Sequence, residues 1–185
     1  MRLADDDICV QIGPEHFTLR PSLRAAVRLE RLAEGDFSAL YQRITTGHLG
    51  TLVGVIVAAS IHLTRSETVH AALRGQPLNH QLSKLALAAM ALLPGITFSK
   101  PAPAGEQTEA KPIPFAQYYQ RLYRIGTGIM RWSPATVWAS TPAEIIEAFN
   151  GYGGTLEEEL AGAPAVADTL DRNGLNKLRG KGRMR

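Results

Sequence analysis

Residues 131–144 read RWSPATVWASTPAE, and this short stretch contains two helix starts and both tryptophans of the chain. Ser133 and Thr141 each stand directly before a proline, so each hydroxyl can cap a helix whose first residue is that proline. Glu144 follows Thr141 by three positions, which is the spacing of a capping box. The stretch therefore predicts two short helices, and its signals specify helix ends rather than catalytic chemistry.

The first 93 residues predict a β-hairpin followed by five helices. Apolar and polar residues alternate on both sides of a turn at 13–16, which is typical of a hairpin with one buried face. Apolar residues then recur at helical spacing between glycines and prolines. Thr64 and Glu67 have capping-box spacing at the start of the fourth helix. The expected helices cover residues 21–34, 37–47, 49–63, 64–74 and 78–93.

A proline-rich stretch separates this part from the rest of the chain. Five prolines and two glycines lie from residue 94 to residue 114, with few large apolar residues. This composition predicts a linker over 94–113, followed by a small helical domain over 114–160 and a weakly apolar helix with a basic tail over 161–185. The sequence therefore predicts a mainly α protein with two domains, of which the first, at 1–93, is a hairpin plus helices.

The basic charge of the chain is concentrated at its C-terminal end. The formal net charge is +3, but the last fourteen residues contain six lysines and arginines, and the remainder has 14 basic against 17 acidic residues. The main body is thus mildly acidic, which does not favour a nucleic-acid-binding surface there. A basic tail can neutralise phosphates, but this one has no aromatic residue to stack on bases, so a solvated terminus is the favoured interpretation.

Three features predict a cytoplasmic protein without membrane contact. The single cysteine, Cys9, excludes an internal disulfide and fits a reducing compartment. The N-terminal residues are acidic rather than apolar, so no export signal is expected. The most apolar run, residues 49–63, is shorter than the roughly 20 residues needed to span a bilayer.

The sequence lacks the motifs that carry common catalytic or cofactor chemistry. None of the five histidines is four positions from another, so no helical metal site is expected. No phosphate-binding glycine-rich motif and no nucleophile elbow occurs. We therefore expect no metal, no cofactor and no catalytic residue, and a binding protein rather than an enzyme.

Large side chains gather in the predicted C-terminal domain, and we take Tyr118, Tyr119, Leu122, Trp132 and Trp138 as candidate partner-binding residues. They can form the core of a small helical bundle, which is the favoured interpretation, or the wall of a groove that binds a partner. The groove stays open as an alternative because a helical unit of about 40 residues can hardly bury so many large aromatics by itself. Tryptophan and tyrosine are also common anchors at interfaces.

Residues 132–144 contain the pattern W-x-P followed by W-x-x-T-P-x-E, which resembles the signature of small tail assembly chaperones from siphophages and gene transfer agents. Val137 stands where a phenylalanine is usual in that signature. Residues 17–44 are similar to a neighbouring tail-protein type of gene transfer agents, which opens with a hairpin and continues into helices. A single chain with both likenesses would be a fusion of the two types.

This resemblance implies a function in the assembly of a bacteriophage, prophage or gene-transfer-agent tail. Such chaperones bind the long, apolar tape-measure protein, keep it soluble and help to recruit tail-tube subunits, without entering the finished particle. The resemblance thus implies these two partners, the host-cell cytoplasm as the location, and no catalytic residues; self-association is left open. From the residues alone, the alternative is a helical adaptor or regulator that binds nucleic acid through its basic C-terminal tail.

Overall fold

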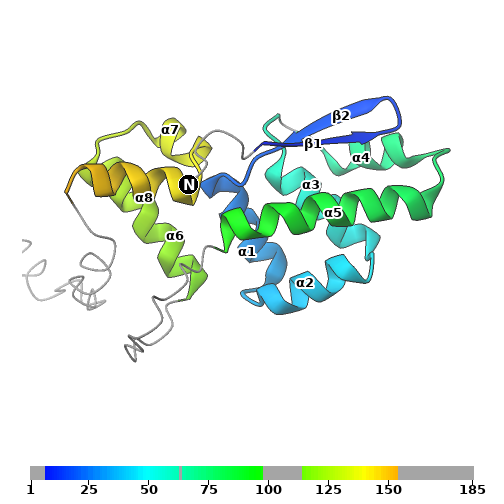
Figure 1. Ribbon diagram of the computed structural model, residues 1–185, viewed down its shortest axis with the longest axis horizontal. Helices are drawn as coiled ribbons and strands as arrows, with labels where there is room; N and C mark the ends of the chain where they lie inside the picture. Colours follow the sequence, from blue (N-terminus) through cyan, green and yellow to red (C-terminus); the bar gives the residue numbers. More distant parts are fainter. Residues whose placement is uncertain (1–6, 63, 98–113, 154–185) are drawn as a thin grey trace, which may run out of the picture.

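The computed structural model describes residues 7–62, 64–97 and 114–153, and in this part of the chain the protein is mainly α-helical. A two-stranded antiparallel hairpin, β1 Ile8–Ile12 and β2 Glu15–Leu19, precedes the helices (Figure 1). The predicted fold class is therefore confirmed. The helical elements follow as α1 Leu23–Ala33, α2 Phe37–Thr45, α3 Leu49–Ala59, α4 Ser66–Leu73, α5 Leu78–Ile96, α6 Phe115–Arg124, the π-helical turn η1 Ile125–Ile129, α7 Pro134–Ala139 and α8 Pro142–Gly151.

The hairpin lays an apolar face on the helices. Val10 pairs with Phe17 across the two strands, and Gly13 adopts a φ of 56° in the turn, a conformation that glycine takes readily. Every second side chain points inward, as the alternation in the sequence predicts. β1 packs against α4 and α5, and β2 packs against α3. The buried side chains of the hairpin are Val10, Ile12, Phe17 and Leu19.

Contacts with the hairpin end α3 earlier than the sequence predicts. The apolar run indicated a helix over 49–63, but α3 ends at Ala59, and Ser60 is extended. At this point the chain joins β2, because the Ile61 amide donates a hydrogen bond to the Thr18 carbonyl at 3.0 Å. Hydrogen bonds to a distant strand thus replace the last turn of the expected helix.

The capping box predicted for Thr64 and Glu67 at the start of α4 is wrong. The residue at the N-cap is Arg65, whose side chain makes no cap hydrogen bond. The Thr64 hydroxyl is instead hydrogen-bonded to the Ser60 hydroxyl at 2.8 Å. α4 is therefore held in place by the packing of buried residues such as Val69, and not by the expected cap.

α5 continues past the residue at which the sequence predicts its end. The expected end at residue 93 came from Pro94, but this proline lies inside α5, which ends at Ile96. Ile96 is fully buried, and a β-carbon on Gly95 would come within 2.9 Å of Pro21. Tertiary packing of the last turn thus outweighs the cost of about 3 kcal/mol for a proline within a helix. None of the described helices is both long and apolar enough to cross a membrane.

α1 lies at the centre of the structure, because helices from both predicted domains pack on it (Figure 1). It contacts α2, α3 and α5 from the first part of the chain, and α6 and α7 from the second. The Leu23 amide at its start also donates to the Ser140 carbonyl at 2.8 Å. Its inner face is rich in alanine, whose small side chain lets several helices approach closely. The buried residues of α1 are Leu23, Ala25, Ala26, Leu29 and Ala33.

The parts of the chain predicted as domains 1–93 and 114–160 therefore meet in a packed interface. The ring of Phe37 meets that of Phe115 edge-on, with ring centroids 4.7 Å apart. The buried side chains of both parts form one continuous hydrophobic core. The predicted linker began at residue 94, but residues 94–96 belong to α5. The rest of the predicted linker from 98 to 113, residues 154–160 of the predicted second domain, and the predicted helix and basic tail at 161–185 lie outside the described residues.

We expect this interface to hold the two parts together after the covalent link between them is cut. A specific protease site inserted between Lys100 and Lys111 should give two fragments that separate on a denaturing gel but co-elute in native gel filtration, because separation would expose the apolar faces of α1 and α6. An inserted sequence of equal length without the protease site is the control. Fragments that elute apart without denaturant would instead indicate two independent domains.

Candidate functional site

The candidate partner-binding residues do not share one environment. Tyr119 and Leu122 point from α6 into the core, where Tyr119 is 1% exposed and Leu122 is completely buried. Tyr118, Trp132 and Trp138 are half-buried and pack against the same core. Tyr119 and Leu122 are therefore core residues, and the part of the aromatic cluster that reaches the surface consists of the other three.

Tyr119 is buried and Tyr118 is half-buried on α6. The Tyr119 hydroxyl donates a hydrogen bond to the Ile96 carbonyl at 3.1 Å, and its ring stacks on that of Phe115. Burial raises the pKa of Tyr118 to about 12. Burial, together with the nearby Tyr118 and Glu30, raises the pKa of Tyr119 well above its usual value. Both phenols thus stay neutral near pH 7.

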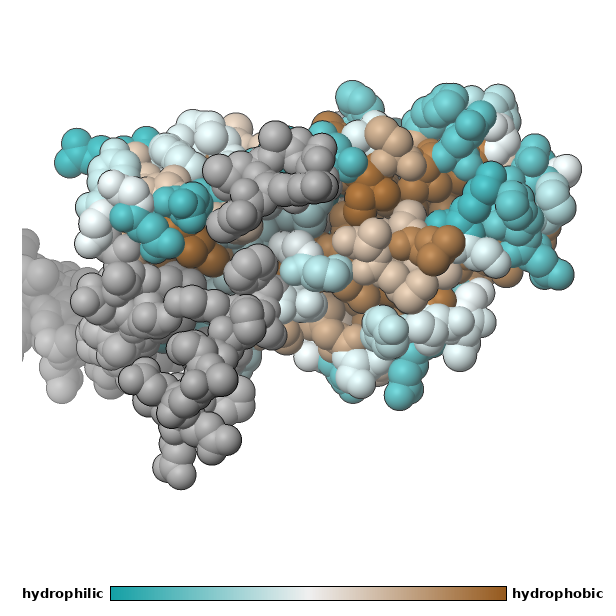
Figure 2. Space-filling model, viewed as in Figure 1, coloured by the Kyte–Doolittle hydropathy of each residue, from teal (hydrophilic) through white to brown (hydrophobic). Residues whose placement is uncertain are grey.

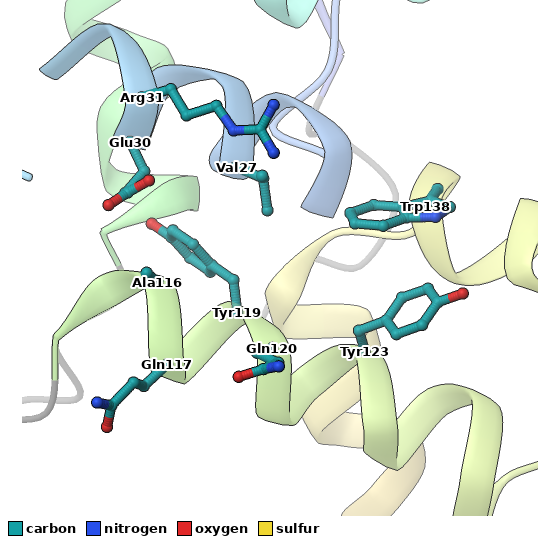
Figure 3. Close-up of a pocket in the computed structure, with 9 residues that line it drawn as sticks. All are labelled: Val27, Glu30, Arg31, Ala116, Gln117, Tyr119, Gln120, Tyr123 and Trp138. Carbon is teal, nitrogen blue, oxygen red and sulfur yellow. The ribbon is translucent and has the colours of Figure 1, made fainter. Parts of the chain in front are cut away.

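Trp138 and Tyr123 form an aromatic pair between α7 and α6. Their ring centroids are 4.8 Å apart, and the ring planes are inclined by 33°. Figure 3 shows the two rings beside each other at one end of a hollow between α1 and α6. Tyr123 follows the core residue Tyr119 by four positions, a spacing that places both on the same helix face.

The hollow is a groove of about 460 Å³ between α1 and α6, which we call the α1–α6 groove (Figure 3). This volume lies within the range of roughly 300–1,000 Å³ that is usual for binding pockets. Its wall combines apolar and aromatic side chains with polar and charged ones. The lining residues are Val27, Glu30, Arg31, Ala116, Gln117, Tyr119, Gln120, Tyr123 and Trp138.

Sequence reasoning missed the α1 side of this groove. Val27, Glu30 and Arg31 are spaced i, i+3 and i+4, so they share one face of α1. The spacing alone does not tell that α6 packs beside this face, because α6 lies more than 80 residues later in the chain. The groove therefore depends on a long-range contact that local patterns do not specify.

The π-helical turn η1 fixes the position of α7, and with it the position of Trp138. A β-carbon on Gly126 would lie only 2.7 Å from Cγ2 of Val137, which is completely buried. A glycine at this position thus lets the backbone of η1 approach the Val137 side chain closely. Because Trp138 directly follows Val137, this contact sets the point from which the indole extends.

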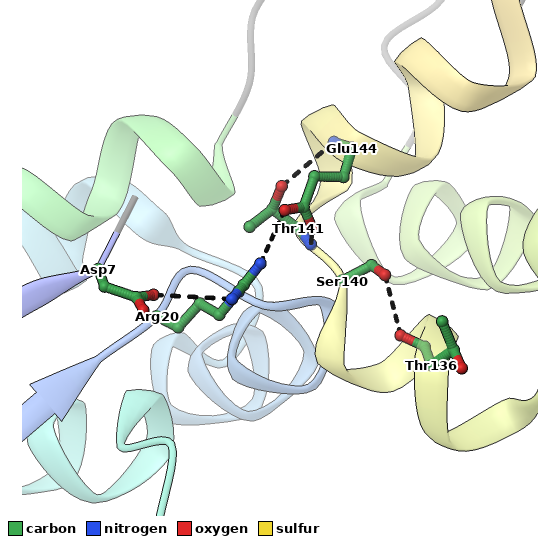
Figure 4. Close-up of polar contacts among 6 residues, drawn as sticks. All are labelled: Asp7, Arg20, Thr136, Ser140, Thr141 and Glu144. Atoms are coloured by element: carbon green, nitrogen blue, oxygen red, sulfur yellow. Dashed lines mark hydrogen bonds and ion pairs between the residues drawn. The ribbon is translucent and has the colours of Figure 1, made fainter. Parts of the chain in front are cut away.

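The helix caps around α7 and α8 are those that the sequence predicts. The Ser133 side chain caps α7, and Thr141 and Glu144 form a capping box with bonds of 2.8 and 3.1 Å. Glu144 also accepts a hydrogen bond from the Arg20 guanidinium at 2.7 Å (Figure 4). The same carboxylate therefore stabilises the start of α8 and ties it to the segment before α1, next to Trp138.

A second apolar surface lies on α5. Figure 2 shows apolar side chains gathered over α5, with hydrophilic ones around them. Leu87 on this helix is 65% exposed. Nearby, a pocket of about 400 Å³ is lined by residues of α2, α5 and α6 and their flanks, none of them charged. We call Leu87 and this pocket the α5 surface; the pocket residues are Phe37, Ser38, Tyr41, Met90, Leu93, Pro94, Thr97 and Phe115.

The described residues provide no metal-binding cluster. In residues 7–62, 64–97 and 114–153, no group of three or more His, Cys, Asp or Glu side chains could hold a metal ion. Cys9 is a free, exposed cysteine on β1. The side chains that line the α1–α6 groove can make apolar, aromatic and ionic contacts.

No protein-family model matches the chain, and no curated protein or solved structure matches it.

Replacing Gly126 by alanine should destabilise the protein by about 1–3 kcal/mol, because the new methyl group overlaps with Val137. Gly128 lies in the same π-helical turn, and no atom lies within 4 Å of the position its β-carbon would take. Gly128→Ala is therefore a matched control that should be neutral or stabilising by up to about 1 kcal/mol. Urea unfolding followed by circular dichroism measures both, and equal effects of the two substitutions would contradict the close contact.

Proposed function

We propose that this chain is a tail assembly chaperone that binds a tape-measure protein and assists assembly of the tail tube. The observation that carries the proposal is the α1–α6 groove, in which Trp138 and Tyr123 stand beside a wall that combines apolar side chains with polar and charged ones. The pattern W-x-P and W-x-x-T-P-x-E at 132–144 supports the same function, because it includes Trp138 itself. The proposed place of action is the host-cell cytoplasm, before the tail is complete.

A tape-measure protein would offer a ligand that fits such a groove. It is expected to be a long helix with apolar stripes that are exposed until the tube surrounds them. A helix of this kind can insert side chains at i, i+3, i+4 and i+7 into a groove between two other helices. The half-buried Trp138 is a suitable anchor, since tryptophan and tyrosine are enriched among the residues that contribute most to binding.

The α5 surface gives the proposal a second contact area. Its pocket carries no charged side chain, whereas the α1–α6 groove carries Glu30 and Arg31. Two surfaces of different character suit a protein that brings two partners together, here the tape-measure protein and the tail-tube subunits. The charged groove is the more selective of the two, because charges discriminate between partners more sharply than apolar area does.

A helical adaptor that binds nucleic acid through its basic tail is the alternative function. The six basic residues in the last fourteen favour it, and these residues lie outside the described part of the chain. Such an adaptor would bind DNA in a salt-sensitive way and would lose this binding when residues 179–185 are deleted. A chaperone that uses the α1–α6 groove would still capture the tape-measure protein after the deletion.

Trp138→Ala should weaken capture of the tape-measure protein by about 2 kcal/mol or more, the usual cost of removing an interface anchor. Tyr152→Ala is the matched control, because Tyr152 is an aromatic residue of the same part of the chain, is 69% exposed and lies outside the groove. Binding is measured by isothermal titration calorimetry with the co-purified tape-measure segment, and stability by circular dichroism melting.

The two readouts together decide the role of Trp138. Weaker binding with an unchanged melting temperature supports the groove, whereas a large fall in melting temperature assigns Trp138 to the core. Co-expression tests the function more broadly, since the tape-measure protein should be more soluble in the presence of this chain. Equal insolubility with and without the chain would contradict the proposed chaperone function.

A further inference from the structure

Three arginines on α1 lie beside the α1–α6 groove without an ionic partner in the described structure. Arg24, Arg28 and Arg31 are exposed and spaced i, i+4 and i+7, so they form a stripe about 10 Å long on one side of the helix. Among the described residues, none of the three guanidinium groups forms an ion pair or a hydrogen bond. We call these residues the arginine stripe.

The arginine stripe borders the groove along α1. Arg31 lines the groove itself (Figure 3). Arg24 lines a smaller hollow of about 90 Å³, which Trp138 also lines, so Trp138 stands between the two hollows. Arg28 lies one helical turn from each of the other two. On the α6 side, the polar residues that line the groove are the neutral amides Gln117 and Gln120, so among the lining residues the positive charge is that of Arg31 on α1.

We propose that the α1–α6 groove binds an amphipathic helix with a row of carboxylates along one edge, and that this helix is a segment of the tape-measure protein. The inference rests on the proposed function, which supplies the partner, and it specifies the segment by its chemistry. Apolar side chains of the segment enter the groove beside Trp138. Its carboxylates, spaced at i, i+4 and i+7, face the arginine stripe, whose charges repeat at the same spacing.

Two features of the groove favour an acidic helix over a nucleic-acid strand. The Glu30 carboxylate lines the groove next to Arg31, and it would repel a backbone with a negative charge on every nucleotide. A protein helix can place a lysine opposite Glu30. In addition, the rings of Trp138 and Tyr123 pack on each other, so one face of each ring is unavailable for stacking on a base.

A second copy of this chain is a poorer match for the groove. None of the described helices carries three carboxylates to oppose the arginine stripe. The acidic pair on α8 consists of Glu144 and Glu147, and Glu144 is already bonded to Arg20 and to the backbone at its own helix start. Among the described helices none offers the carboxylates that the arginine stripe would face, so we take a different protein as the partner.

The test uses the full chain and two labelled peptides. The acidic probe is a helical peptide of about 20 residues with leucines on one face and glutamates along one edge, long enough to populate a helix. The matched probe has lysine in place of each glutamate. The test variant combines Arg24→Gln, Arg28→Gln and Arg31→Gln. The control variant removes the same charge at exposed positions on the two flanks of α4 and on α5, through Arg65→Gln, Arg74→Gln and Lys84→Gln.

Fluorescence anisotropy should show that the wild-type chain binds the acidic probe about tenfold more tightly than the lysine probe, with an affinity that falls as salt rises. The test variant should bind the acidic probe about tenfold more weakly, and the control variant less than about twofold more weakly. Circular dichroism melting should be unchanged in both variants, because the substituted side chains are exposed.

Several results would overturn this inference. Equal binding of both probes, or unchanged binding of the acidic probe by the test variant, would exclude the arginine stripe from recognition. Displacement of the acidic probe by a single-stranded oligonucleotide at lower concentration than by unlabelled acidic probe would assign the groove to nucleic acid. The groove would be assigned to a second copy of this chain by a different pair of results. Sedimentation would show a dimer for the wild type and a monomer for the test variant, and neither protein would bind the acidic probe.

Capture of the tape-measure protein by the wild type and by the test variant distinguishes a failure of this inference from a failure of the proposed function. If wild type and test variant capture the tape-measure protein equally well, the chaperone function stands and the role of the arginine stripe fails. If the acidic probe binds through the arginine stripe but the tape-measure protein is not captured, the groove keeps its preference for an acidic helix and the proposed partner is wrong.

Discussion

The packing of α1 against helices from both halves of the chain is the interaction on which the rest of the structure depends. One side of α1 is buried against α2, α3 and α5, and α6 and α7 pack on it from the other half. Burial of a large side chain such as Leu29 contributes roughly 1.5–3 kcal/mol, so this shared face is a main source of stability. The same helix also presents Val27, Glu30 and Arg31 to the α1–α6 groove. Fold and candidate site therefore share one helix.

Two local contacts connect the packing of α1 with the position of Trp138. The close contact of Gly126 with Val137 places α7 against η1, and the bond from the Arg20 guanidinium to Glu144 holds the start of α8 near α1. Trp138 lies between these two fixed points, and its ring rests on Tyr123. An indole held in this way loses little conformational freedom when a partner binds, which favours affinity.

Local signals in the sequence predicted most elements of the fold, and long-range contacts account for what they missed. Alternation predicted the hairpin, and the hydroxyls of Ser133 and Thr141 predicted the starts of α7 and α8. The predicted ends of α3 and α5 were wrong because tertiary contacts decide both. A hydrogen bond to β2 follows the end of α3, and burial of Ile96 extends α5. In the candidate site, Trp138 was identified from its residue type, whereas the α1 side of the groove follows only from the packing of α6 beside α1.

Hydrogen–deuterium exchange of the full chain, free and bound to the tape-measure protein, tests most directly whether the α1–α6 groove is the binding site. Binding there would suppress local opening of the helices that form the groove. The account predicts slower exchange in α1, α6 and α7, with unchanged exchange in α4, which lies away from the groove (Figure 1). Slower exchange confined to α5, with α1 and α6 unchanged, would contradict it and would place the partner on the α5 surface.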